Sequence, residues 1–553
     1  MDISRRTFLK TGALAVTGAA LAELSPALAD APPYPRVRAM HQHVDLPRRI
    51  GTTPDLPPLN VIALNRLMFG PHPTDWAAFE ALGSTPTERL TNFVAQQLNP
   101  GSLDDSACEA RIAAQGFTTL NKTLQQLWLD HRVNAANYTV RSQPFNEGRR
   151  VTWLKAVYSK RQLFEVLTDF WHNHFNIYGW HYDVLPVWIH YDRDVIRANV
   201  LGNFRTFLES VATSTAMLYY LDNVYSSNAG PNENWARELF ELHTLGAENY
   251  LGSMQQTQVP GYPNNPIGYV DNDVYESARA FTGWTVRNSS SFGNTGEFFT
   301  YQPWHDRFQK TVLGRHLLND RPALEDGRAV LDAAAAHPGT ARHVCTKLCR
   351  RLIADDPPQA VIDAAVATWT THQQAPDQLK RVVETIVLSP EFADAWGQKV
   401  KRPFELTASM LRATAAEFVP NDDFFWTYGL MGQKLFEWTP PNGYPDVHDI
   451  WTGTNVMVYR WNIAYHLVAG NVDGTTIDIL GQMPPGTVTS NAITDFWIQR
   501  ILGRPLDAED RSRLVDFISQ GRNPDLPLSA EEITERTPRL VELIMRTPDF
   551  QWR

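Results

Sequence analysis

The sequence predicts a mainly α-helical protein with one large multi-helical body. Apolar residues recur at three- and four-residue spacing along most of the chain, as in Leu124, Leu127 and Trp128. Hydrophobic residues make up 43% of the chain, so a sizeable core is available. Glycines, asparagines and prolines interrupt the periodicity at about 245–315. We expect a long irregular loop region there, with room for one short β hairpin.

The N-terminus predicts export. A twin-arginine pair in the segment 4–10 precedes a weakly apolar run at 11–24 and a small-residue cleavage site at 27–29. Paired arginines before a Gly- and Ala-rich run are typical of a twin-arginine signal peptide. We therefore exclude residues 1–29 from the fold and expect the mature protein to be periplasmic or secreted.

After the signal peptide, residues 30–58 are rich in proline and predict an extended arm. The helical body then spans 59–472, and a C-terminal helical segment spans 473–553. Within the body, apolar periodicity predicts helices at 60–68, 74–82, 86–98, 104–131, 147–174, 184–200, 203–212, 232–245, 273–282, 323–336, 338–352, 358–371, 377–388, 401–416 and 421–434.

Composition and charge exclude several classes of partner. The formal net charge is −10, which gives no global electrostatic reason to bind nucleic acid. No apolar run of about twenty residues follows the signal peptide, so we expect no membrane span in the mature chain. The three cysteines, Cys108, Cys345 and Cys349, are a poor match for an extracellular disulfide framework.

Common catalytic signatures are absent from the sequence. It has no Gly-rich phosphate loop, no His-Glu-x-x-His motif and no Gly-x-Ser-x-Gly elbow. Phosphoryl-transfer, hydride-transfer and serine-hydrolase interpretations therefore lose their best support. Clusters of histidine and acidic residues stand out instead.

The first cluster lies in the segment 161–176. Asp169 and His172 form an acid-x-x-His pair, a type that helical bundles use to hold a metal from inside. His174 is two residues further on and joins the same ion only if the helix ends near Asn173. In the alternative interpretation this is a helix terminus whose two histidines bond main-chain carbonyls.

The second cluster lies in the segment 232–246, where Glu238 and Glu241 share one helix face and His243 follows. Two carboxylates one turn apart repel each other unless a cation lies between them. A metal ion is one candidate, with Glu238, Glu241 and His243 as ligands. An arginine in a buried structural network, such as Arg237 or Arg279, is the other.

A third candidate is the loop pair His305 and Asp306, close to Lys310. Polar groups beside glycines and tryptophans are typical of pocket walls and also of packed turns. In the catalytic interpretation, Glu241 or Asp306 acts as the base and His305 completes the site.

Together these segments resemble the family called domain of unknown function 1800, or DUF1800. The resemblance runs from about Leu64 to at least Leu467 and is looser from Asp473 onward. The segments that carry it are 66–70, 170–175, 221–223, 232–246, 280–284, 305–306, 399–403 and 441–446. It implies a helical, exported protein whose histidine and glutamate motifs share one site, and it names no reaction. Such proteins are often encoded beside a second twin-arginine-exported family, domain of unknown function 1501, which looks like a sulfatase or alkaline phosphatase relative.

The leading functional hypothesis is an exported enzyme that depends on a divalent metal ion. Its predicted ligands are Asp169, His172, His174, Glu238, Glu241 and His243. We expect hydrolytic chemistry in the first place and oxidative chemistry in the second. The competing hypothesis is a non-enzymatic helical protein that binds or assembles with the companion exported protein.

Overall fold

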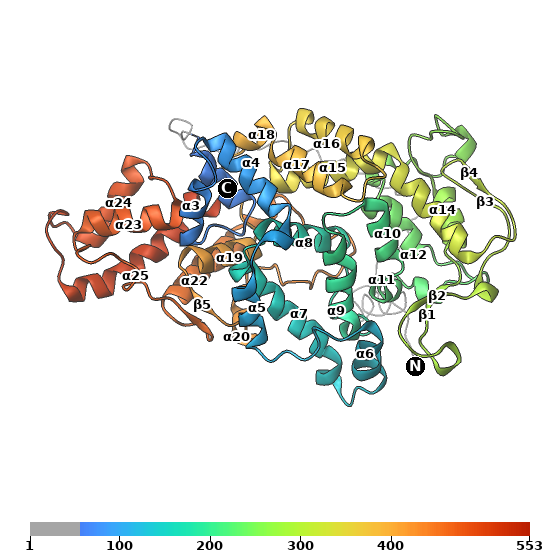
Figure 1. Cartoon of the computed structure of the whole chain (residues 1–553), viewed down its shortest axis with the longest axis horizontal. Coiled ribbons are helices and arrows are strands. Elements are labelled where there is room, and N and C mark those ends of the chain that lie inside the picture. Colours follow the sequence, from blue (N-terminus) through green and yellow to red (C-terminus); the bar gives the residue numbers. More distant parts are fainter. Residues whose placement is uncertain (1–55) are drawn as a thin grey trace, which may run out of the picture. The chain divides into compact units, whose positions relative to one another are not determined.

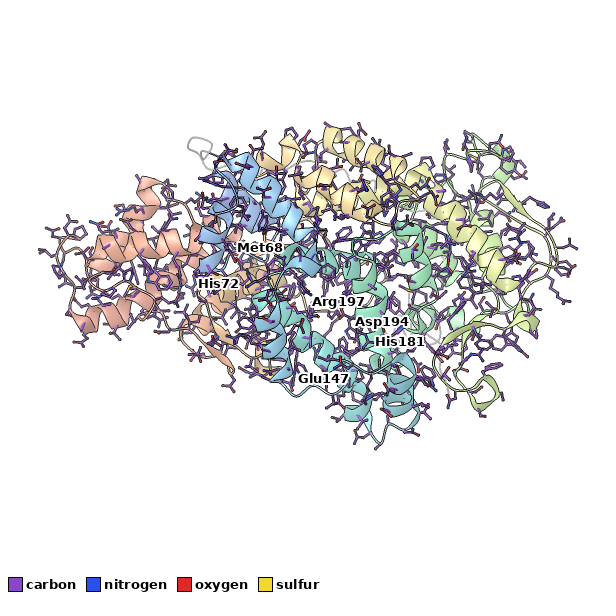
Figure 2. All side chains as sticks on the ribbon, viewed as in Figure 1. Met68, His72, Glu147, His181, Asp194 and Arg197 are labelled. Carbon is purple, nitrogen blue, oxygen red and sulfur yellow. The ribbon has the colours of Figure 1, made fainter. Side chains whose placement is uncertain are left out.

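Helices provide nearly all the regular structure of residues 56–553, the part of the chain that this computed structural model describes (Figure 1). The mainly α-helical prediction is thus confirmed. The signal-peptide prediction and nearly all of the predicted arm lie outside the described residues. Side chains fill the space between the helices (Figure 2). No helix within 56–553 is long and apolar enough to cross a membrane.

The first half of the described chain contains helices α2 (Leu59–Arg66), α3 (Pro73–Glu80), α4 (Pro86–Gln97), α5 (Ser106–Ala113), α6 (Leu124–Trp128), α7 (Tyr138–Tyr158), α8 (Gln162–His174), α9 (Trp188–His190), α10 (Phe204–Ala212), α11 (Thr215–Tyr220), α12 (Glu233–Glu238) and α13 (Asp271–Ala280). Wider π-helical turns follow α6, α9 and α12, at η2 (Leu129–Val133), η4 (Tyr191–Ile196) and η7 (Leu239–His243). Such π turns are rare and often lie at functional sites.

The second half contains helices α14 (Ala323–Ala336), α15 (Pro338–Leu352), α16 (Gln359–Thr371), α17 (Gln378–Val387), α18 (Pro390–Ala393), α19 (Pro403–Ala413), α20 (Asp422–Gly429), α21 (His448–Trp451), α22 (Thr454–Val468), α23 (Ser490–Leu502), α24 (Ala508–Ser519), α25 (Ala530–Arg546) and α26 (Pro548–Gln551). Three antiparallel two-stranded ribbons complete the described structure.

The irregular region carries the predicted hairpin. Strands β1 (Trp284–Val286) and β2 (Phe298–Thr300) pair antiparallel, with Trp284 opposite Thr300. A second hairpin lies at the C-terminal end of the irregular region and is formed by β3 (Lys310–Val312) and β4 (Arg315–Leu317). The third ribbon, β5 (Glu417–Phe418) with β6 (Thr475–Thr476), joins distant parts of the chain.

Helix α19 lies at the centre of the core. All of its residues are buried, as expected for a helix surrounded by other elements. Its Phe404 ring packs edge-on against Trp153 of α7, with ring centroids 4.5 Å apart. Trp153 also contacts Phe424 of α20 at 4.7 Å. Aromatic residues therefore join α7, α19 and α20 in the core.

The predicted helix 147–174 is two helices, α7 and α8. Asp105 holds the break between them, because its carboxylate accepts the Ser159 hydroxyl at 2.8 Å and the Lys160 amide at 2.7 Å. The Gln162 side chain donates to the Ser159 carbonyl at 2.8 Å. Buried side chains thus bond the free backbone groups at the helix ends. Apolar periodicity does not reveal these contacts.

The predicted helix 104–131 is also interrupted, between α5 and α6. Gly116 lies at a φ of +67°, a conformation that favours glycine. The following amides of Thr118 and Thr119 donate to the carboxylate of Glu147 on α7. A long-range hydrogen-bond partner therefore ends the periodic pattern.

Residues 56–553 form one compact unit that includes the C-terminal segment. Helix α25 packs on α22, and residues 551–553 return to the segment 399–401. Lys401 donates its amide to the Gln551 carbonyl at 3.0 Å, and Arg553 donates to the Asn65 carbonyl at 3.2 Å. The last helices are thereby joined to α2 and α19.

Candidate functional site

His172 is buried near the end of α8 and is paired with Asp192. Its Nε2 lies 2.8 Å from Asp192 Oδ1, and its ring lies against Trp188 and Phe436. Arg197 donates to both Asp192 oxygens at 3.0 and 2.9 Å. Burial alone would raise the pKa of Asp192, but Arg197 and His172 outweigh it and lower that pKa. His172 therefore belongs to a compensated ion-pair network.

The cavity beside His172 is small. Its volume is about 10 Å³, and Glu165, Asp169 and Arg197 line it together with His172. Such a volume holds about one water molecule. Arg197 also donates to Glu165 at 2.8 Å, so this second acid is neutralised as well. The cavity is too small for a substrate.

Asp169 is held by arginines. Arg402 donates to its Oδ2, and Arg351 approaches the same oxygen at 3.4 Å. Both guanidinium groups also contact Glu405, which accepts a further bond from Arg553 at 2.9 Å. Guanidinium groups thus supply the positive charge that a metal was expected to supply at Asp169.

His174 and His243 meet at the junction of α8 and η7. His174 Nε2 lies 3.2 Å from the His243 carbonyl, and His243 Nδ1 lies 3.1 Å from the His174 carbonyl. A carbonyl only accepts, so both nitrogens must donate. The other nitrogens, His174 Nδ1 and His243 Nε2, are buried without a hydrogen-bond partner among the described residues. The helix-terminus alternative, in which His172 and His174 bond carbonyls, therefore describes His174 but not His172, which pairs with Asp192.

Two basic groups from α15 adjoin this pair. His343 lies between the Glu248 carboxylate, 2.9 Å from Nδ1, and the Leu242 carbonyl, 3.2 Å from Nε2. Burial, with a smaller contribution from Arg350, lowers the pKa of Lys347 to about 8. Burial and the neighbouring Lys347 in turn lower the pKa of both His174 and His243. This basic surrounding repels a divalent cation.

Glu238 and Glu241 remain uncompensated. Neither half-buried carboxylate has a hydrogen-bond or ion-pair partner within residues 56–553. Arg237 instead pairs with Glu233 at 3.2 Å and lies 3.6 Å from Asp271. Burial, and then the charge of Glu241, raises the pKa of Glu238 to about 7. A carboxyl group that titrates near neutral pH is a candidate acid or base.

Arg279, the other arginine expected near these acids, holds Asp306 instead. It donates to both Asp306 oxygens at 2.8 and 3.0 Å. Burial would raise the pKa of Asp306, but the Arg279 hydrogen bonds outweigh it and lower that pKa. A clamped carboxylate with a lowered pKa is a weak base.

His305 lies in a separate buried network. Its Nδ1 is 2.9 Å from the Thr282 carbonyl and its Nε2 is 3.3 Å from Asp326. Lys310 bonds the same Asp326 oxygen at 2.8 Å. His305 is 1% exposed, so no substrate reaches it in this structure.

The predicted residues therefore divide among separate groups. The fold brings His174 to His243 and keeps Glu238 beside Glu241. No hydrogen bond or ion pair between described residues joins His172 or His305 to the glutamate pair. Within residues 56–553, no three His, Cys, Asp or Glu side chains are arranged to hold a metal ion. The donor set does not fit one six-ligand centre.

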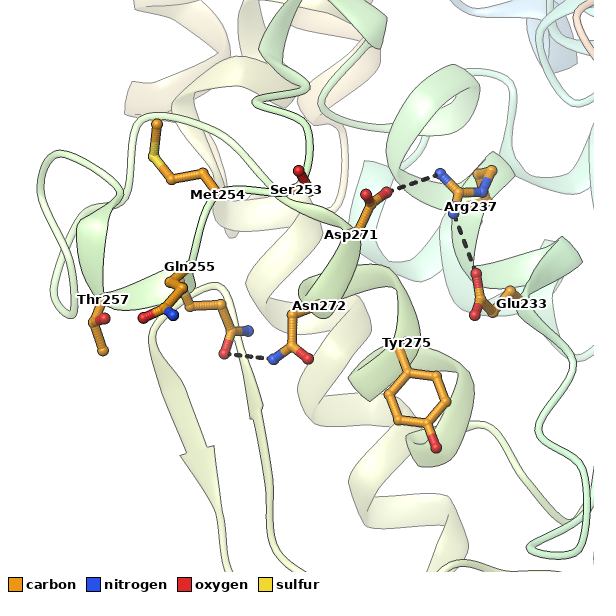
Figure 3. A pocket seen from close by; sticks show the side chains of 10 residues that line it. Glu233, Arg237, Ser253, Met254, Gln255, Thr257, Asp271, Asn272 and Tyr275 are labelled. Carbon is orange, nitrogen blue, oxygen red and sulfur yellow. Dashed lines mark hydrogen bonds and ion pairs between the residues drawn. The ribbon is translucent and has the colours of Figure 1, made fainter. Parts of the chain in front are cut away.

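An open hollow of about 730 Å³ begins on the same helix as the glutamate pair. Its wall includes Glu233 and Arg237 of α12, the loop 253–257, and Asp271, Asn272 and Tyr275 of α13 (Figure 3). Ligand pockets commonly have such volumes. The sequence pointed to this region through the cluster 232–246, which contains Glu233 and Arg237, and through the irregular stretch that contains the loop.

Sequence reasoning missed the partners of the predicted residues. Asp192 and Arg197 are five residues apart, which on a regular α-helix places them on different faces. The π-helical segment η4 brings them together, since its turns are wider. Lys347 and His343 stand one turn apart in a predicted helix, and that spacing was the available signal for a shared face.

The family model described as "Protein of unknown function (DUF1800)" matches residues 62–552. The chain belongs to the DUF1800 family. The match extends through the C-terminal helices, where the resemblance is looser. No curated protein and no solved structure matches the chain.

Two segments that carry the DUF1800 resemblance meet at Asn173. Its amide donates to the Tyr444 carbonyl at 2.8 Å, and its oxygen accepts the Tyr444 amide at 2.7 Å. Gly443 lies at a φ of +71°, and a Cβ there would be 2.1 Å from the Asn173 carbonyl. Only glycine allows this close approach. The segment 441–446 of this DUF1800 protein thus fixes the end of α8.

Proposed function

We propose that this DUF1800 protein is an exported hydrolase whose reactive groups are Glu238 and Glu241. One observation carries the proposal: these are the predicted acids that form no hydrogen bond or ion pair with a basic side chain among the described residues. They follow Arg237, which lines the 730 Å³ hollow, along the chain: Glu238 ends α12 and Glu241 lies in η7.

The two carboxyl groups suit complementary roles in hydrolysis. Glu238, whose pKa is about 7, is partly protonated at neutral pH and donates a proton to the leaving group. Glu241 accepts a proton from the attacking water. The water oxygen bonds to the electrophilic atom as the bond to the leaving group breaks, so protons and charge balance. Pairs of carboxyl groups in unlike environments commonly divide acid and base roles in this way.

Metal dependence is an alternative to this division of acid and base roles. In it, Glu238 and Glu241 would both be ionised and would hold one hard divalent cation, with water or substrate completing its coordination, as Mg²⁺ sites with one or two carboxylates do. When bound, such an ion would polarise a substrate oxygen. Arg-clamped Asp169 and the paired His172 take no part in this site.

The test is hydrolysis of chromogenic esters, phosphates and glycosides by the purified mature protein, with and without Mg²⁺, alongside metal analysis. Glu238→Gln and Glu241→Gln should each lower kcat by about 100-fold or more on the substrate class that reacts. The exposed Glu384→Gln on α17 is the matched control and should keep full activity. Unchanged rates in both glutamine variants would refute the proposal.

Export is proposed from the N-terminal segment. Replacement of Arg5 and Arg6 by lysine should retain the full chain in the cytoplasm, because the twin-arginine machinery reads that pair. Cell fractionation measures the outcome. Unchanged appearance of the double variant in the periplasm or medium would contradict this route.

A non-enzymatic role is the second candidate. The ion-pair networks in which arginines neutralise buried aspartates favour it. Asp169, Asp192 and Asp306 are all neutralised by arginines, as expected for groups that specify a fold. In this role the chain would bind a companion exported protein of the domain of unknown function 1501 family. Co-purification of the pair, together with no hydrolysis of any substrate class, would favour this candidate.

A further inference from the structure

The hollow beside α12 and α13 has a lining whose fixed charges are already paired. Arg237 lies between Glu233 and Asp271, as the dashed contacts in Figure 3 show. Asp271 also accepts the Tyr250 hydroxyl at 2.5 Å. Two carboxylates against one guanidinium leave an excess of one negative charge. An anionic ligand therefore finds no free cation among the lining residues.

The remaining lining groups are neutral hydrogen-bonding groups. Ser253, Gln255 and Thr257 are exposed in the loop, and their side chains have no partner among the described residues. The Asn272 amide donates to Gln256 at 2.9 Å, which leaves its own oxygen as an acceptor. Hydroxyl and amide groups both donate and accept, so they match a ligand that is rich in hydroxyl groups.

The lining also offers apolar surface. Tyr275 is 45% exposed and Met254 is 40% exposed. In Figure 3, Met254 and Tyr275 come from the loop and from α13, on different sides of the polar groups. An exposed tyrosine ring presents a flat apolar face at low entropic cost. A sugar ring has such a combination, with C–H groups on its face and hydroxyl groups on its edge.

The loop is held in place against α13. Gln256 donates to Asp273 and to the Thr311 carbonyl, both at 2.7 Å. Gln256 therefore fixes the loop, while its neighbours Gln255 and Thr257 remain available. A pre-formed wall reduces the ordering cost of binding.

We propose that this hollow binds a neutral saccharide. Hydroxyl groups of the sugar bond Gln255, Asn272 and the loop hydroxyls, and the Tyr275 ring packs on its apolar face. The binding site follows from the lining residues alone. Only its assignment as the substrate subsite of Glu238 and Glu241 rests on the proposed function.

The experiment titrates the purified mature protein with cellotriose and with maltotriose, and follows binding by calorimetry. Inorganic phosphate and galacturonate are the anionic comparisons. We expect binding of at least one neutral trisaccharide and none of the two anions. Tyr275→Ala and Gln255→Ala should each weaken binding by about tenfold, the effect of losing one ring contact or one hydrogen bond.

Matched controls lie elsewhere on the surface. Tyr138 is 55% exposed at the start of α7, and Gln125 is exposed on α6. Tyr138→Ala and Gln125→Ala should bind the trisaccharide as the unaltered protein does. Absence of saccharide binding would overturn the proposal. It would also be overturned by equal losses in the control variants, or by preferred binding of phosphate or galacturonate.

Failure of the hydrolase proposal is distinguishable from failure of this one. Glu238→Gln and Glu241→Gln lie outside the hollow's lining and should keep trisaccharide affinity within about twofold. Retained binding without hydrolysis of any tested glycoside supports a saccharide-binding protein and refutes only the enzyme. Hydrolysis of esters or phosphates without saccharide binding supports the enzyme and refutes this inference.

Discussion

His174 and His243 hold each other by exchanging ring-to-carbonyl hydrogen bonds of 3.2 and 3.1 Å. The exchange joins the last turn of α8 to the π-helical segment η7, 69 residues later in the chain. Each ring satisfies a buried carbonyl at a helix end, where the helix itself provides no partner. It also fixes the end of η7, the segment that carries Glu241.

Removal of this exchange should destabilise the protein. His243→Ala leaves the His174 carbonyl unsatisfied and opens a cavity, so the free energy of unfolding should fall by about 2–4 kcal/mol. Urea-induced unfolding measures the change. His316 is exposed on β4, and His316→Ala should cost less than about 0.5 kcal/mol. A loss in His243→Ala no greater than in this control would contradict a structural role.

The same two imidazoles should make stability depend on pH. Burial lowers the pKa of His243 to about 3, and the pKa of His174 is also well below its ordinary value near 6.5. Below pH 6.5 the unfolded chain binds protons that the folded chain does not. The free energy of unfolding therefore decreases as the pH is lowered from 6.5 to about 3. At pH 5 the His243 imidazole should cost about 2 kcal/mol relative to pH 8, and His174 should add to this loss. Melting temperatures of His243→Ala should fall less steeply over this range.

Glu238 should produce the opposite dependence. Its pKa, raised from 4.5 to about 7, means that the folded chain binds more protons than the unfolded chain between these pH values. The carboxyl group therefore destabilises the fold as pH rises through this window, and the effect is complete above pH 7. Glu238→Gln should melt at a higher temperature than the unaltered protein at pH 8, and at the same temperature at pH 4. A lower melting temperature at pH 8 would indicate that a bound cation already compensates the charge.

The buried guanidinium network at Asp169 should be costly to break. Arg402→Met removes a buried donor to Asp169 and should lower the free energy of unfolding by about 3–5 kcal/mol. The surface pair of Arg342 and Asp363, at 2.8 Å, is the comparison. Arg342→Met should cost at most about 1 kcal/mol. Similar urea midpoints for the two variants would show that the Asp169 network contributes little.

The local spacing of apolar residues was sufficient to predict many of the helices. Apolar spacing predicts helices α10, α14 and α15 to within a residue or two of their ends, because each buries one face along its own length. It does not predict the break after α7, because that break depends on the distant carboxylate of Asp105.

For the site, the order of residues establishes which chemical groups are available: the imidazoles at 172, 174, 243 and 305 and the carboxylates near them. It also establishes the mainly helical class, because periodicity is a local property. The partner of each group depends on the folded chain. Arg402 reaches Asp169 from 233 residues away, and no arginine forms a hydrogen bond or ion pair with Glu238 or Glu241 among the described residues. Charge compensation depends on distances across the fold, and spacing along the chain does not contain those distances.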